Sequence, residues 1–135
     1  MTQLILDCEP VFQFVTQYFP LNRSAGQQGI GLQKDGRLIA GVLYDDYNGS
    51  NIWMHVAAEP GKRWLNREYL HACFAYPFKQ LNCSRISGWV EASNTDARRF
   101  DEHLGFQQEA VLSGAARDGG DVIIYRMFKK ECKYV

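Results

Sequence analysis

The chain has 135 residues, of which 46% are hydrophobic and 22% are charged. This composition is that of a globular protein, and the length fits a single domain over residues 1–135. The 15 basic and 15 acidic residues cancel, so net charge gives no general attraction to nucleic acid or to an anionic membrane. We expect neither as a partner, and no apolar run approaches the roughly 20 residues that a membrane crossing needs.

The cysteines at positions 8, 73, 83 and 132 have none of the close spacings of a zinc site, so no metal is expected. The N-terminal residues MTQLILDCEP lack the basic region and apolar run of a secretion signal. We therefore expect reduced thiols and a cytoplasmic location.

Apolar spacing in the first half predicts one helix among several strands. The helix, over 11–19, is ended by Pro20. Strands are predicted over 4–6, 29–33, 37–44 and 51–57, with a loop over 22–28. In the strand over 51–57, Ile52, Met54 and Val56 share one face, and Trp53 and His55 share the other.

The second half alternates between helical and strand patterns. A helix over about 64–74 is ended by Pro77, and a strand follows over 85–91. Asn94 caps a helix that ends at Gly105. A hairpin is predicted with strands over 108–117 and 122–129. This order predicts an α/β domain of the mixed α+β kind, with a mixed, mostly antiparallel central sheet flanked by helices.

Residues 94–106, NTDARRFDEHLGF, resemble the strand-to-helix segment of the GNAT N-acetyltransferases, and 109–127 resemble the last hairpin of that family. Residues 61–78, GKRWLNREYLHACFAYPF, followed by 85–102, are similar to compact members from bacteria and bacteriophages. The resemblance implies a single acyl-CoA-binding domain that moves an acetyl group from acetyl-CoA to an amine by direct attack. The alternative is a catalytically degenerate domain that binds coenzyme A or a protein partner.

The resemblance also implies the cofactor contacts. Backbone N–H groups at the end of the strand over 51–57 hold the thioester carbonyl, here at Val56, Ala57 and Ala58. Asn94 contacts the pantetheine arm or only caps its helix. The loop and helix start that bind the pyrophosphate correspond to Lys62, Arg63, Trp64, Leu65, Asn66 and Arg67.

The basic residues of this loop have a physical reading of their own. Lys62, Arg63 and Arg67 lie within one turn of a helix N-terminus and form a local positive patch that favours phosphate binding. The glycines usual in the family's loop are mostly absent here, and a solvated basic surface is the alternative reading.

The catalytic groups are less regular. Asp101 stands where the family usually has the Tyr that protonates the leaving thiolate; a carboxyl whose pKa is raised by burial can do this, and a rim carboxylate paired with Arg98 or a lysine is the alternative. Glu59 and His55 are the candidate bases, and Tyr125 is a further candidate acid.

The acceptor, a small-molecule or protein amine, is left open, and the resemblance implies that the loop over 22–28 selects it. Exposed tryptophans at 53, 64 or 89 would suit a homodimer.

Overall fold

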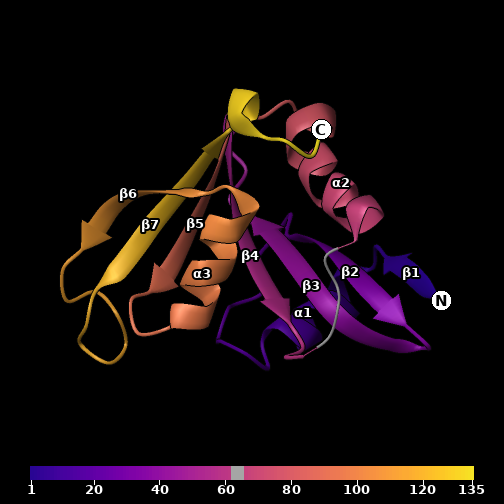
Figure 1. Ribbon diagram of the computed structural model, residues 1–135, viewed down its shortest axis with the longest axis horizontal. Coiled ribbons are helices and arrows are strands. Elements are labelled where there is room, and N and C mark those ends of the chain that lie inside the picture. Colours follow the sequence, from indigo (N-terminus) through magenta and orange to yellow (C-terminus); the bar gives the residue numbers. More distant parts are fainter. Residues whose placement is uncertain (62–65) are drawn as a thin grey trace.

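A computed structural model describes residues 1–61 and 66–135 (Figure 1). Within these residues seven strands form one sheet in the order β1-β2-β3-β4-β5-β7-β6. The elements are β1 Thr2–Ile5, α1 Cys8–Val15, β2 Gln28–Lys34, β3 Arg37–Asp45, β4 Asn51–Ala58, α2 Arg67–Ala75, the π-helix Tyr76–Gln80, β5 Arg85–Glu91, α3 Thr95–Leu104, β6 Gln107–Leu112, β7 Val122–Phe128 and a short 3-10 helix Lys129–Glu131. The predicted order of strands and helices is confirmed.

The sheet is mixed and mostly antiparallel, as predicted. The one parallel pair among the described strands joins β4 to β5, and its register covers three residue pairs, from Asn51↔Arg85 to Trp53↔Ser87. β4 nevertheless stays paired with β3 as far as Ala58, and β5 stays paired with β7 as far as Glu91. The two strands therefore diverge beyond Trp53, and α3 lies in front of the resulting opening (Figure 1).

Helix α1 covers one face of the sheet. Its Val11, Phe14 and Val15 pack against Leu43 of β3 and Ala57 of β4. Glycines in β2 and β3 let the helix approach closely, because a Cβ built on Gly41 would meet Val15 Cγ2 at 3.1 Å and side-chain atoms of Phe14 and Val11 at 3.2 Å. Helices α2 and α3 cover the other face, where the larger core cluster includes Tyr69, Phe74 and Leu104.

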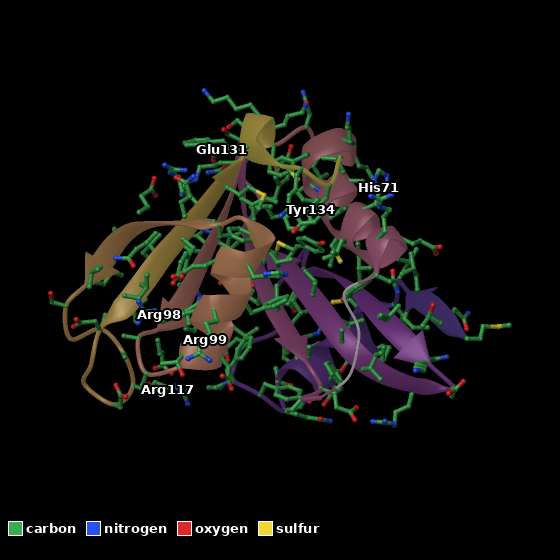
Figure 2. All side chains as sticks on the ribbon, in the orientation of Figure 1. His71, Arg98, Arg99, Arg117, Glu131 and Tyr134 are labelled. Atoms are coloured by element: carbon green, nitrogen blue, oxygen red, sulfur yellow. The ribbon has the colours of Figure 1, made fainter. Side chains whose placement is uncertain are left out.

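The C-terminal tail returns to α2. Figure 2 shows His71 on this helix beside Tyr134, and the His71 Nδ1 lies 3.0 Å from the Tyr134 carbonyl oxygen. The Tyr134 ring stacks on Phe74, with ring centroids 4.8 Å apart. These contacts tie the last residues to the helix that follows the candidate cofactor loop. Among the described helices, none has the length and apolarity that a membrane crossing requires.

Three predicted boundaries are wrong. Helix α1 ends at Val15 rather than near Phe19, since the residue before a proline avoids the helical region and Thr16 Oγ1 bonds the Phe12 carbonyl oxygen at 2.8 Å. Pro77 does not end the second helical segment, which continues as a π-helix with Pro near its start, where a missing N–H costs little.

The third wrong boundary is in the last hairpin, whose first strand ends at Leu112 rather than at Arg117. Residues 113–121 instead form a connection held by side chains. The Gly114 N–H donates to Asp121 Oδ1 at 3.0 Å, and the Arg117 N–H donates to Glu91 Oε2 at 2.7 Å.

Candidate functional site

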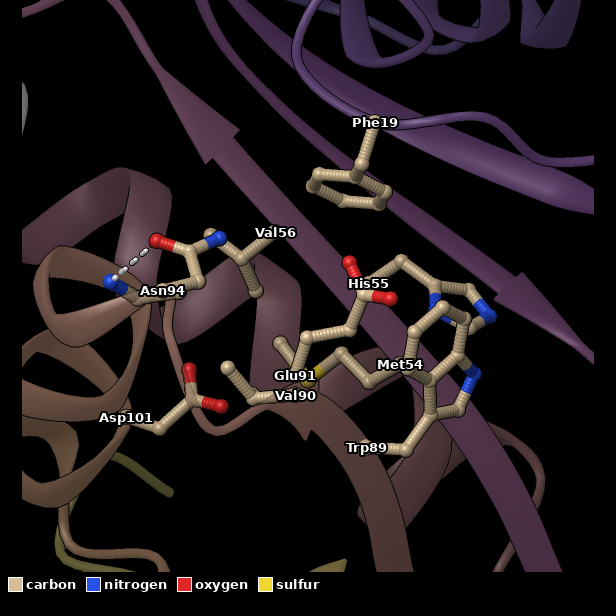
Figure 3. Close-up of a pocket in the computed structure, with 10 residues that line it drawn as sticks. Phe19, Met54, His55, Val56, Trp89, Val90, Glu91, Asn94 and Asp101 are labelled. Atoms are coloured by element: carbon tan, nitrogen blue, oxygen red, sulfur yellow. Dashed lines mark hydrogen bonds between the residues drawn. The ribbon is translucent and has the colours of Figure 1, made fainter. Parts of the chain in front are cut away.

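Two neighbouring cavities lie at the opening between β4 and β5. The smaller, of about 40 Å³, is bordered by β4, β5, α3 and the segment after α1 (Figure 3). The larger, of about 500 Å³, extends from it past the end of β4 and along α3. Both cavities are lined by Phe19, Val56, Asn94 and Ala97, so they are neighbouring parts of one site.

The backbone of β4 directs N–H groups into this site. The Glu59 N–H donates to the Ile39 carbonyl oxygen of β3 at 2.8 Å. In an antiparallel pair the direction of backbone hydrogen bonds alternates residue by residue. The Ala57 N–H therefore points towards β3. The N–H groups of Val56 and Ala58 point the other way, to the side on which β5 has diverged from β4. Of the three residues predicted to hold a carbonyl, two have the required direction.

Asn94 caps α3 and also borders both cavities. Its Oδ1 accepts a hydrogen bond from the Ala97 N–H at 3.2 Å, which is the dashed line in Figure 3. The capping role predicted for Asn94 is therefore present, and its Nδ2 remains as a hydrogen-bond donor at the edge of the site.

Asp101 borders the smaller cavity from α3 (Figure 3). Burial, and secondarily the negative charge of Glu102, raises the pKa of this carboxyl from 3.8 to about 7. The alternative pairing with Arg98 is not found. Arg98 instead reaches the Tyr125 hydroxyl and the Ala92 carbonyl oxygen, each at 3.5 Å. Asp101 can therefore carry a proton near neutral pH, which an ordinary Asp cannot do.

Tyr125 is not brought into the site. Its ring is fully buried in the larger core, and its hydroxyl donates to Glu102 Oε2 at 2.7 Å. Burial raises the pKa of this phenol. Arg98 and Glu102 of α3 are therefore linked through the Tyr125 hydroxyl of β7.

His55 is held by a partner that the sequence analysis missed. The His55 side chain is 4% exposed, and its Nε2 lies 3.2 Å from both carboxylate oxygens of Asp45, at the end of β3. Gln27 also donates to Asp45, at 3.5 Å. An Nε2–H bonded to Asp45 leaves the lone pair on Nδ1. The His55 residue borders the smaller cavity.

No family model matches the chain. An uncharacterised N-acetyltransferase of Methanocaldococcus jannaschii is 32% identical over 99 residues, which cover 72% of this chain and 62% of that protein. A mutant of the spermidine N-acetyltransferase SpeG from Vibrio cholerae superposes with a TM-score of 0.78, at 16% identity, over 98% of this chain and 97% of that one. An acetyltransferase of the GNAT family from Bacillus anthracis gives 0.64, at 19% identity, over 79% and 68%.

The chain has the GNAT fold. The predicted fold class is therefore confirmed. The match spans about three fifths, 62%, of the length of this curated relative.

In the GNAT fold of this chain, part of the predicted cofactor loop lies outside the described residues, namely Lys62, Arg63, Trp64 and Leu65. The residues that follow are described. Asn66 caps α2, with its Oδ1 accepting from the Tyr69 N–H at 2.6 Å, and Arg67 is the first residue of the helix. A capped helix start with a basic residue therefore follows the loop directly.

Glu59 lies at the far end of the same GNAT-type opening. It borders the larger cavity and is ion-paired with Arg37 on β3. Because a strand rises about 3.3 Å per residue, Glu59 stands about 13 Å along the chain from His55. The fold does not bring the two candidate bases together, and only His55 borders the smaller cavity beside Asp101.

Proposed function

We propose that this protein is an N-acetyltransferase that moves an acetyl group from acetyl-CoA to an amine by direct attack. The observation that carries the proposal is the divergence of β4 and β5, which turns the Val56 N–H towards a cavity bordered by His55 and Asp101. The N-acetyltransferase relative of Methanocaldococcus jannaschii supports the same activity.

The larger cavity is where the acetyl group and pantetheine arm of acetyl-CoA would bind. The thioester end of this donor would lie at Val56, and its pantetheine arm would pass Asn94, whose Nδ2 can donate to an amide carbonyl. Its pyrophosphate would lie at the start of α2, where backbone N–H groups and Arg67 favour an anion. Lys62 and Arg63, predicted for the same contact, would add positive charge.

The chemistry follows from the groups around the smaller cavity. His55, held by Asp45, takes a proton from the acceptor ammonium, and the neutral amine nitrogen attacks the thioester carbonyl carbon. The Val56 N–H stabilises the oxyanion of the tetrahedral intermediate. The carbon–sulfur bond would then break, Asp101 would give its proton to the leaving thiolate, and the nitrogen of the new amide would lose its second proton to water. The pKa of about 7 at Asp101 supports retained catalysis over the degenerate alternative.

The test combines thiol release with donor binding. We expect acetyl-CoA at about 100 times its Kd to stabilise the fold by about 2.7 kcal/mol, measured as a rise in Tm, and to release free thiol only when an amine is present. Donor binding without thiol release across a broad amine panel would instead support the degenerate domain. Absence of both effects would overturn the proposal.

A further inference from the structure

A third cavity, of about 340 Å³, lies on the face of the sheet that α1 covers. His55 and Trp89 border both this cavity and the smaller cavity of the candidate site. The two rings meet edge to face, with centroids 6.0 Å apart. They therefore stand between the place proposed for the thioester and a separate entrance on the α1 side. The remaining lining residues are Leu21, Asn22, Ser24, Asp45, Asp46 and Trp53.

The charge of this cavity is negative. Asp45 and Asp46 border it, and among the described residues that line it none is a lysine or an arginine. The nearby Arg23 is turned towards α1, where its Nε pairs with Glu9 Oε1 at 3.2 Å and its guanidinium donates to Gln27 at 2.8 Å. Asp46 is exposed and makes no ion pair within residues 1–61 and 66–135.

The cavity is also aromatic. Trp53 and Trp89 are both half-buried, and their rings offer negative π faces that attract an organic cation. Carboxylates beside tryptophan rings select positive charge and reject a carboxylate-bearing ligand. A cavity of about 340 Å³ suits a small molecule better than a folded partner.

We propose that this cavity is the acceptor site and that it takes a small amine carrying a second positive charge. The proposal rests on the proposed acetyltransferase function and names its substrate class. The reacting amine would pass His55 and Trp89 to reach the thioester at the smaller cavity, and His55 would take its proton there. The distal cation would lie between Asp46 and Trp53, at the entrance.

Three probes of equal carbon length test the charge requirement. They are 1,4-diaminobutane, butylamine and 4-aminobutanoate, each assayed by thiol release at saturating acetyl-CoA. We expect kcat/KM to fall in that order, with about tenfold between the diamine and butylamine, as a charged hydrogen bond supplies. A preference for 4-aminobutanoate, or for a lysine peptide over the diamine, would overturn the proposal.

A matched pair of variants locates the selectivity. Asp46 and Asp35 both have positive φ, 55° and 52°, a region that Asn adopts readily. Asp46→Asn should lower kcat/KM for the diamine about tenfold and leave butylamine nearly unchanged. Asp35→Asn, in the turn at the opposite end of β3, should change neither. An equal loss for both amines in Asp46→Asn would contradict the assignment.

Binding separates failure of this proposal from failure of the enzymatic function. Calorimetry with 1,4-diaminobutane and the protein alone should show binding that Asp46→Asn weakens about tenfold. If acetyl-CoA stabilises the protein and some other amine releases thiol without a preference for diamines, the acceptor proposal fails and the acetyltransferase stands. If acetyl-CoA has no effect, the acetyltransferase fails. Absence of diamine binding overturns the cavity assignment in either case.

Discussion

Asp101 combines two properties that rarely meet in one carboxyl group: it borders a reaction cavity and its pKa is raised to about 7. Both follow from its position on α3, one turn beyond Ala97, where the helix faces the sheet. A Tyr at this place would donate a proton at any neutral pH, whereas Asp101 can donate only while it is protonated. The residue therefore couples the proposed chemistry to pH.

Replacement of Asp101 by Asn should remove this coupling. In the wild type, kcat should fall as pH rises through about 7, because the proton needed by the thiolate is lost. Asp101→Asn should lower kcat by about 100-fold, the usual contribution of a general acid, and should abolish this descending limb. A wild-type limb that persists in Asp101→Asn would assign it to another group.

The same pKa shift makes the free energy of unfolding depend on pH. Because folding raises the pKa of Asp101, this carboxyl adds its full contribution to the free energy of unfolding below the unfolded pKa of 3.8. That contribution is lost as the pH rises through the folded pKa of about 7. Asp101→Asn should therefore be more stable than the wild type at pH 8, by about 1–2 kcal/mol after allowance for solvent, and nearly equal at pH 4. Urea unfolding at the two pH values measures both differences.

At the scale of elements, α1 is placed by the glycines beneath it. Gly41→Ala should lower the free energy of unfolding by about 2 kcal/mol, because the new methyl group overpacks a filled interface. Gly88→Ala is the control, since a Cβ there meets only the Met54 carbonyl oxygen at 3.6 Å. Denaturant unfolding of both variants measures the difference, and equal losses would mean that α1 does not depend on this close approach.

Sequence patterns predicted the elements better than the contacts between them. The alternation of Trp53 and His55 with Met54 was visible, and β4 has the predicted faces. The Asp45–His55 contact was not visible, because it depends on the register of β3 against β4. Residues 113–117 were mistaken for strand, because the contacts that hold them in a loop, such as Arg117 to Glu91, are distant in sequence.

At the scale of the whole molecule, the cancelling charges hide local differences. Lys62, Arg63 and Arg67 put positive charge into the sequence around the start of α2, whereas Asp45 and Asp46 make the cavity on the α1 side acidic. The proposed anionic donor and the proposed cationic acceptor would therefore use separate parts of a neutral chain. Trp53 and Trp89 border that cavity, which gives them a use other than the predicted homodimer contact. The homodimer and a phage origin stay predictions.

The short parallel pairing of β4 with β5 also leaves a signature in amide hydrogen exchange. Along one strand, the N–H groups of Ala57 and Glu59 are protected by β3, whereas those of Val56 and Ala58 face the opening. Exchange should be slow and fast at alternate residues, and acetyl-CoA should slow it at Val56 and Ala58 alone. Uniform protection along β4 would contradict this expectation. Exchange that alternates with a two-residue period would identify the N–H groups of β4 that acetyl-CoA contacts in place of β5.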